Sequence, residues 1–342
     1  MKALIVRLSA IGDVVHTLPA LSALHRHGWE VGWAVEPGAR PILEGHPLLD
    51  HLVPIPAARG FRPGPARAAA SLLRSRRYDA ALDFQGLWKS AAWSRLSRAR
   101  RVIGWSRRWR REPLSAVLAG EHAELPASAT HVIDENLALL RPLGIEAAGH
   151  RDFALPRFPA EADAVDRALA QAGIAADDLV VLNPGGGWPE KLWPAESFGA
   201  LARGLRDRGL RALVSWGPGE EPLADRVVAA SAGAAARSFP TTLRGFTELA
   251  RRARLVVTAD TGPLHLACAV GTPVVALFGP TDPARNGPFA DGDVVLRAPL
   301  VAGARDRFRV PSGGMAEIPV ADVLSAAVRR LGLEGGPRAV AL

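Results

Sequence analysis

The stretch from residue 254 to residue 270 most constrains how this chain can fold, because a strand, a turn and a helix follow one another within it. Residues 254–258 are a short apolar, β-branched run of the kind found in buried strands. Pro263 then begins an apolar segment, and proline is favoured at the first position of a helix, where no N–H is needed. We therefore expect residues 260–262 in a tight turn at the carboxyl end of a strand.

The same turn is a candidate anion site. The backbone N–H groups of Thr261 and Gly262 would point outward at the start of the helix, where the helix dipole is positive. Asp260 and His265 flank this position and could hydrogen-bond hydroxyl groups or a phosphate. A capped helix start with a buried histidine would give the same pattern, so this stretch alone leaves both interpretations open.

The order of strand, loop and helix recurs along the chain. A strand at 3–8, a loop at 9–13, a helix from Thr17 to about residue 27 and a strand at 30–35 form a βαβ unit at the start. A proline-containing linker lies at 153–159. Further strands are expected at 79–83, 179–183, 211–216, 254–258 and 274–278.

These patterns predict two α/β domains, residues 1–155 and 156–342, each built as a series of βα units. A length of 342 residues fits two domains of medium size. The last helix of the chain could also pack back on the first domain.

The composition limits which binding partners and which cellular compartment we expect for this protein. The net charge of +8 favours an anionic partner: a nucleic acid, a phosphorylated substrate or an acidic membrane surface. The single cysteine, Cys268, leaves no internal disulfide and no cysteine-based metal site, which is typical of a reducing compartment. No apolar run approaches membrane-spanning length, and Arg7 interrupts the apolar start, so we expect a strand there rather than a signal peptide.

Lysine is rare among the basic residues. It occurs only at positions 2, 89 and 191, although the chain has 42 lysines and arginines in total. A GC-rich genome would produce the same bias. Where a lysine is retained, however, a compact ammonium charge can be required instead of a guanidinium fork.

Arginine is concentrated in two segments, 59–77 and 105–111, and the second also contains Trp105 and Trp109. A run of charge is usually a solvated face. Two such clusters in one half of the chain, one with interleaved tryptophan, favour contact with an acidic surface.

Polar loops follow the expected strands, and a parallel sheet brings such loops to one edge. In the second half they contain Gly185 to Gly187 before Lys191, the pair Glu220 and Glu221, Asp260, and Asp282. Asp13 holds the corresponding place after the first strand, although a helix cap would explain it equally well.

Several chemistries find little support. The glycines at 185–187 lack the spacing of a dinucleotide-binding fingerprint, and the chain has no P-loop, zinc-protease motif or Gly-x-Ser-x-Gly elbow. His25 and His27 are two residues apart and would not share a helix face. The sequence therefore does not favour hydride transfer, nucleotide hydrolysis or metalloprotease activity.

Seven segments, taken together, resemble the bacterial ADP-heptose:lipopolysaccharide heptosyltransferases, glycosyltransferase family nine, and heptosyltransferase I in particular. They are residues 8–20, 83–91, 111–114, 131–136, 191–194, 260–265 and 278–283. The resemblance extends from position 4 to about position 283 and is far more specific than any one motif.

The resemblance implies a GT-B fold, with two Rossmann-like, doubly wound parallel-sheet domains facing across a cleft. The first domain would take the acceptor and the second the nucleotide sugar. The family moves L-glycero-D-manno-heptose from ADP-heptose to a Kdo sugar on lipid A, with inversion, on the cytoplasmic face of the inner membrane. For this chain it implies a monomer on the anionic inner-membrane surface, with no nucleic-acid partner, no cofactor and no metal.

The resemblance also assigns roles. Asp13 is the candidate general base, and Lys191 would neutralise the diphosphate as ADP leaves. The expected donor-binding residues are Gly186, Gly187, Lys191, Glu220, Glu221, Asp260, Thr261, Gly262 and His265. The expected acceptor-binding residues are Ser9, Gly12, Arg59, Arg62, Gln85 and Lys89.

Two departures from the family pattern stand out. Hydroxyl side chains that often precede the lysine are replaced by Gly186 and Gly187, so only backbone amides can bind there. The loop after residue 216 offers both Glu220 and Glu221 to the ribose, and the sequence does not separate them.

The sequence leaves two alternative functions open. A heptosyltransferase II-type enzyme would add a later core heptose to a heptose acceptor. A non-catalytic nucleotide- or nucleic-acid-binding protein is suggested only by the positive charge. The carboxylates of Asp13, Asp260 and Asp282 argue against nucleic acid, since they would repel a backbone phosphate.

Overall fold

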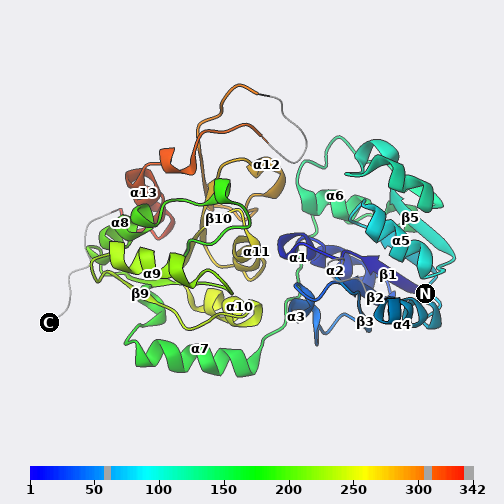
Figure 1. Cartoon of the computed structure of the whole chain (residues 1–342), viewed down its shortest axis with the longest axis horizontal. Helices are drawn as coiled ribbons and strands as arrows, with labels where there is room; N and C mark the ends of the chain where they lie inside the picture. Colours follow the sequence, from blue (N-terminus) through cyan, green and yellow to red (C-terminus); the bar gives the residue numbers. More distant parts are fainter. Residues whose placement is uncertain (58–62, 304–309, 335–342) are drawn as a thin grey trace. The chain divides into compact units, whose positions relative to one another are not determined.

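The computed structural model describes residues 1–57, 63–303 and 310–334. The chain divides into two compact units, Met1–Pro156 and Arg157–Leu342, coloured blue to green and green to red in Figure 1. The division falls one residue from the boundary expected from the sequence.

Unit 1 is built on a six-stranded parallel sheet with the order β3-β2-β1-β4-β5-β6. Its strands are β1 (Lys2–Val6), β2 (Glu30–Val35), β3 (His51–Pro54), β4 (Ala80–Asp83), β5 (Arg101–Trp105) and β6 (Glu121–Ala123). The central strands are near-continuous apolar runs because helices cover both faces of the sheet.

The helices of unit 1 lie on the two faces of this sheet. They are α1 (Ile11–Val15), α2 (Leu18–Arg26), α3 (Arg40–Leu43), α4 (Pro63–Ser75), α5 (Trp88–Leu96) and α6 (Val132–Ala138). Alternate strand residues such as Leu4, Val6 and Ala81 pack with Leu73 of α4 and Trp93 of α5. Helices α2 and α6 pack against each other, and α2 contacts β2.

Unit 2 repeats this architecture with a six-stranded parallel sheet of order β12-β11-β10-β7-β8-β9. Its strands are β7 (Leu179–Asn183), β8 (Arg211–Val214), β9 (Ala235–Arg237), β10 (Leu255–Ala259), β11 (Val274–Phe278) and β12 (Val294–Arg297). The predicted α/β class with two doubly wound parallel sheets is therefore confirmed.

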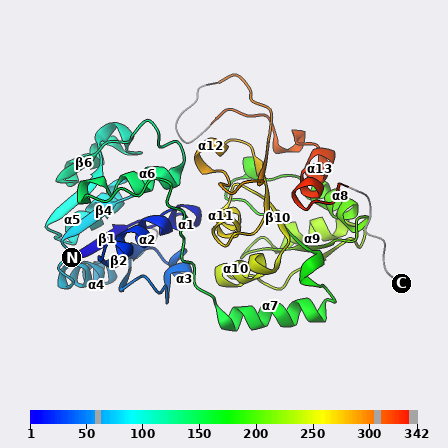
Figure 2. The ribbon, with the colours of Figure 1, turned by 180° about the vertical axis from the view of Figure 1, so that it is seen from behind.

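The helices of unit 2 form two groups. They are α7 (Pro159–Gln171), α8 (Ala195–Arg206), α9 (Glu221–Ala230), α10 (Leu243–Arg252), α11 (Gly262–Ala269), α12 (Pro283–Asn286) and α13 (Val320–Arg330). Buried residues of α8, α9 and α13, among them Phe198, Val227 and Val323, share one core with one face of the sheet. Helix α10 packs beside α7 and α11, and Figures 1 and 2 both show α7 running beside α10.

Two features differ from the expectations. Residues 11–13 begin the short helix α1 instead of lying in a loop. The strands β3, β5, β6, β9 and β12 were not predicted. The last helix, α13, packs against α8, β11 and β12 of its own unit, and this contact buries its apolar face.

Candidate functional site

The first candidate site lies where the connections of the unit 2 sheet change direction. Strands β7 and β10 are neighbours, but the chain leaves β7 toward β8 and returns to β10 on the other side. Ligands of doubly wound sheets bind at such a switch point, beyond the carboxyl ends of the strands. The loop after β7, residues 184–191, and the turn at 260–262 therefore lie side by side at this edge.

Three predicted residues meet there. The Lys191 Nζ donates to the backbone oxygen of Asp260 at 2.9 Å and to its Oδ2 at 2.8 Å. The Nε2 of His265 lies 3.2 Å from Asp260 Oδ1. The Lys191 ammonium also lies 4.6 Å from the centre of the Trp188 ring. An ammonium carries three N–H donors, of which Asp260 takes two.

The protonation state of Asp260 follows from these neighbours. Burial alone would raise the pKa of its carboxyl group. The hydrogen bond and charge of His265, together with the charge and hydrogen bond of Lys191, outweigh burial and lower the pKa well below the ordinary value. Asp260 is therefore a carboxylate at neutral pH, and a carboxylate with such a low pKa is a weak general base.

The N-terminus of α11 completes this site. Thr261 is the N-cap residue, in an extended conformation, and its side chain does not cap the helix. The first N–H groups of a helix have no acceptor within the helix. Their partial positive charge, beside the Lys191 ammonium, makes this turn suited to an anion such as a phosphate. His265 is buried as one interpretation expected, but the helix start has no side-chain cap.

A row of polar side chains beneath the two loops was missed in the sequence. Asn183 donates to Ser215 Oγ at 3.1 Å and accepts from Thr258 Oγ1 at 3.2 Å. Thr258 Oγ1 also lies 3.4 Å from Thr261 Oγ1. This row connects the ends of three strands and holds the turn that contains Thr261. The available signal was a polar residue at or just after the end of each apolar strand.

The structure separates the two glutamates. A Cβ atom on Gly185 would lie 2.2 Å from Glu220 Oε1, so the absence of a side chain there lets Glu220 lie against the β7 loop. Glu220 Oε2 also accepts the N–H of Gly217 at 2.9 Å. Glu221 instead forms an ion pair with Arg237 at 2.8 Å and is half exposed. Glu220 is thus the glutamate that lies beside the candidate site.

The two glycines before Lys191 differ in their surroundings. A Cβ atom on Gly186 would lie 2.9 Å from a methyl group of Leu192, whereas a Cβ atom on Gly187 would meet nothing within 4 Å. A side chain at Gly186 would therefore displace the Leu192 methyl group, and Gly187 leaves its backbone open to approach.

The second candidate site lies at the switch point of unit 1, between β1 and β4. Gln85 joins the two loops there: its Oε1 accepts the N–H of Leu8 at 3.1 Å, and its Nε2 donates to the Ser9 oxygen at 3.2 Å. Lys89 Nζ donates to Ser9 Oγ at 3.4 Å and to Glu36 Oε1 at 2.9 Å. Three of the expected acceptor-binding residues therefore form one cluster.

Asp13 lies on α1 beside this cluster, next to Gly12. Its Oδ1 is 2.5 Å from Nη2 of Arg7, whose side chain is buried, and its Oδ2 accepts the N–H of Ala10 at 3.3 Å. The Asp13 side chain is 39% exposed, so the carboxylate is accessible to a substrate while one oxygen is held. The contact with Ala10 shows that Asp13 also supports the helix start. Arg7 was not identified as a site residue from the sequence.

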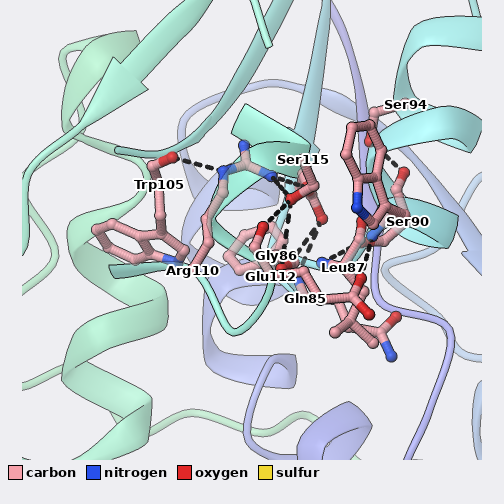
Figure 3. A network of polar contacts seen from close by, with 12 residues as sticks. Gln85, Gly86, Leu87, Ser90, Ser94, Trp105, Arg110, Glu112 and Ser115 are labelled. Carbon is pink, nitrogen blue, oxygen red and sulfur yellow. Dashed lines mark hydrogen bonds and ion pairs between the residues drawn. The ribbon is translucent and has the colours of Figure 1, made fainter. Parts of the chain in front are cut away.

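A buried network supports the loop that carries Gln85 (Figure 3). Asp83 Oδ1 accepts the N–H groups of Gln85 at 3.2 Å and Gly86 at 3.1 Å. Asp83 Oδ2 is 2.7 Å from Nη1 of Arg110, which also donates to Ser115. The Arg110 Nε donates to the Trp105 oxygen at 2.7 Å.

This network corrects the expectation that all of segment 105–111 meets an acidic surface. Trp105 and Arg110 are buried and belong to the core. Arg108 and Trp109 both bind Glu124, at 2.6 Å and 2.9 Å. The local run of basic residues gave no sign of these partners, which lie up to 27 positions away. Arg59 and Arg62 lie outside the described residues.

Among residues 1–57, 63–303 and 310–334, no group of three or more histidine, cysteine, aspartate or glutamate side chains is arranged to hold a metal ion. None of the helices in the described part of the chain is both long and apolar enough to cross a membrane.

Comparisons with known proteins agree with the resemblance in the sequence. The sequence model of "Glycosyltransferase family 9 (heptosyltransferase)" matches residues 66–308. Lipopolysaccharide heptosyltransferase 1 of Pseudomonas aeruginosa is 32% identical over 86% of this chain and 83% of that protein. The protein of the same name from Escherichia coli K12 is 30% identical over 87% of this chain and 94% of its own length.

Among solved structures, E. coli heptosyltransferase WaaC with ADP-2-deoxy-2-fluoro heptose is 27% identical to this chain. The aligned region covers 95% of this chain and 98% of the WaaC chain, with a TM-score of 0.75.

Proposed function

Since the chain belongs to glycosyltransferase family 9, the heptosyltransferases, we propose that it transfers heptose from ADP-L-glycero-D-manno-heptose to a Kdo sugar of Kdo-lipid A. The reaction inverts the anomeric centre and contributes to the inner core of lipopolysaccharide. The observation that carries the proposal is the cluster of Lys191, Asp260 and His265 at the start of α11. Relatives named lipopolysaccharide heptosyltransferase 1, about 30% identical over most of the chain, support the choice of substrates.

In the proposed donor complex, the diphosphate of ADP-heptose lies at the N-terminus of α11. The amides of Thr261 and Gly262 and the third N–H donor of Lys191 bind its oxygens. The backbone at Gly187 approaches the same group. Asp260 holds the lysine and, with His265, hydrogen-bonds donor hydroxyls. This arrangement stabilises the charge that develops on ADP as the bond to heptose breaks.

Glu220 is the proposed partner of the donor ribose. It lies against Gly185 at the candidate site, whereas the carboxylate of Glu221 is engaged by Arg237. A carboxylate can accept hydrogen bonds from both ribose hydroxyls.

Asp13 is the proposed general base. The acceptor hydroxyl attacks the anomeric carbon of heptose, its proton passes to the Asp13 carboxylate, and ADP departs with the electrons of the broken C–O bond. Asp13 is partly exposed, whereas Asp260 is buried between Lys191 and His265 and has a strongly lowered pKa. Asp13 is therefore the more accessible carboxylate of the two.

The acceptor is proposed to bind at the cluster of Ser9, Gln85 and Lys89, next to Gly12 and Asp13. The Lys89 ammonium would bind the carboxylate of Kdo. We further propose that the protein acts as a monomer at the cytoplasmic face of the inner membrane, where such an acceptor is anchored.

Incubation with ADP-heptose and Kdo-lipid A, followed by mass spectrometry, tests the proposal. We expect a product that is heavier than the acceptor by one heptose. Transfer only to an acceptor that already carries heptose would instead support a heptosyltransferase II-type reaction. No transfer to either acceptor would contradict the proposed function.

A further inference from the structure

Unit 1 contains a slot between α4 and α5, and Lys89 is the one residue of its lining that the proposed function already uses. Its volume is about 520 Å³. Its walls are mainly apolar and are formed by Ala66 and Ala70 of α4, Ala92, Trp93 and Leu96 of α5, and Pro56 and Pro63. The charged residues around it are Glu36, Arg67, Arg74 and Lys89.

The slot follows from the spacing of residues on the two helices. Ala66 and Ala70 are four positions apart and share one face of α4. Trp93 and Leu96 are three apart and share one face of α5. Because the α4 residues are small, the two helices touch but leave an apolar space between them.

The surroundings of the slot are strongly basic. Between positions 63 and 100 the chain has eight lysines and arginines, two aspartates and no glutamate. Both aspartates are engaged: Asp83 is buried against Arg110, and Asp79 lies 3.4 Å from Arg100. Arg67 and Arg74 are exposed and seven positions apart, hence on one face of α4, and both line the slot.

We propose that this α4–α5 face docks on an anionic phospholipid bilayer, with one acyl chain entering the slot and lipid phosphates binding Arg67 and Arg74. An apolar slot with a cationic rim complements an acyl chain next to an anionic head group. The inference deepens the proposed function and rests on it for one point, a membrane-anchored acceptor. Lys89 and Glu36 line the slot and also reach the Ser9 cluster, so the docked face is continuous with the proposed acceptor site.

Binding of the whole protein to vesicles tests the role of Arg67 and Arg74 at the edge of the slot. We expect binding to phosphatidylglycerol vesicles, little binding to phosphatidylcholine vesicles, and weaker binding as salt is added, because exposed charges are screened over about 8 Å at physiological ionic strength. Each basic residue near an anionic surface contributes about 1 kcal/mol. The double variant Arg67→Gln/Arg74→Gln should therefore bind about 30-fold more weakly, which corresponds to about 2 kcal/mol.

The matched control is Arg167→Gln/Arg329→Gln, which removes the same charge from exposed positions of unit 2. It should bind phosphatidylglycerol vesicles like the unaltered protein. Thermal unfolding confirms that both double variants remain folded. Absence of vesicle binding, or an equal loss of binding in both double variants, would overturn the proposal.

Quenching by brominated acyl chains tests the slot itself. Trp93 lines the slot, so phosphatidylglycerol with brominated chains should quench more fluorescence in the unaltered protein than in Trp93→Phe. Equal quenching in the two proteins would show that no chain reaches Trp93 and would overturn insertion. Neither assay depends on heptose transfer, and transfer to a water-soluble, deacylated acceptor without vesicles tests the proposed function separately.

Discussion

At the scale of single residues, substitution of the proposed base, Asp13, is the sharpest test of unit 1. Asp13→Asn keeps the size of the side chain but removes its proton affinity. We expect turnover to fall by roughly 10²–10⁴-fold, as for loss of a general base. ADP affinity, measured by calorimetry, should stay nearly unchanged, since Asp13 belongs to the proposed acceptor side.

Asp260→Asn serves as the contrast for Asp13. Asp260 orients Lys191 and His265, so its loss should weaken ADP binding as well as slow turnover. If Asp13→Asn retains more than about a tenth of turnover, a factor worth only about 1.4 kcal/mol, Asp13 only supports the start of α1 and the base lies elsewhere.

Substitution of Lys191 is the corresponding test for unit 2. Lys191→Ala removes the ammonium from the anion site, and a hydrogen bond to a charged group contributes about 1.5–3 kcal/mol. ADP affinity should therefore fall by roughly 10- to 100-fold in calorimetry, and turnover should fall with it. Lys2→Ala is the matched control, because it removes a lysine that is also paired with a carboxylate, in unit 1. Unchanged ADP affinity in Lys191→Ala would exclude Lys191 from the site.

The buried side chain of His46 leads to a prediction about how the stability of the folded protein depends on pH. Burial lowers its pKa from 6.5 to about 4, against the opposing effects of a hydrogen bond that the imidazole donates to the Phe153 backbone and of the charge of Asp152. In the unfolded chain His46 takes up a proton near pH 6.5, whereas in the folded protein it does so only near pH 4. The folded protein should lose stability as the pH falls from 6.5 to 4, by about 3 kcal/mol from this residue.

Urea unfolding of His46→Gln at pH 7.5 and pH 5 checks this prediction. The loss of stability between the two pH values should be smaller in His46→Gln than in the unaltered protein. His25→Gln, at an exposed position, should behave like the unaltered protein. An equal pH dependence in His46→Gln and the unaltered protein would contradict the assignment.

At the scale of elements, the loop between β4 and α5 depends on the buried pair of Asp83 and Arg110. Asp83→Asn leaves the Arg110 charge buried without its partner, which typically costs about 3–5 kcal/mol. The double variant Asp83→Asn/Arg110→Met removes both charges and should recover part of that loss. Urea unfolding of the four proteins of the cycle, which includes Arg110→Met, measures the coupling. Additive effects of the two single changes would show that the pair is not coupled.

Several strands of this fold were predictable from the local pattern of apolar residues. The bounds of β2, β7 and β11 agree with the expected apolar runs, and the turn at 260–262 lies where Pro263 placed it. Buried parallel strands give a strong signal because both of their faces are apolar. Of the strands that were not predicted, β3, β6, β9 and β12 are only three or four residues long, and these short runs give no comparable signal.

The candidate site was predictable where chemistry and spacing are local. Asp260, His265 and Lys191 follow from residue type and position. The contacts of Arg7 with Asp13 and of Asp83 with Arg110 depend on which loops the sheet order brings together, and so do those of Asn183. Sequence-local reasoning cannot supply that order, which is why Arg110 was first assigned to a surface cluster.

At the scale of the whole molecule, each unit has its own sheet, its own core and its own switch point. The proposed donor residues belong to unit 2, and the proposed base and acceptor residues belong to unit 1. Proteins with two domains often depart from two-state unfolding. We therefore expect two transitions in calorimetric unfolding, one for each unit.

ADP should raise the temperature of one transition only. A ligand that binds only the folded form stabilises it by about 2.7 kcal/mol at a concentration 100 times its dissociation constant. Lys191→Ala should reduce this shift, whereas Asp13→Asn should leave it unchanged. The other transition should be the one that His46→Gln makes less sensitive to pH between 6.5 and 4, because His46 lies in unit 1. A single transition that responds to both ADP and His46→Gln would show that the units unfold together and would contradict this division.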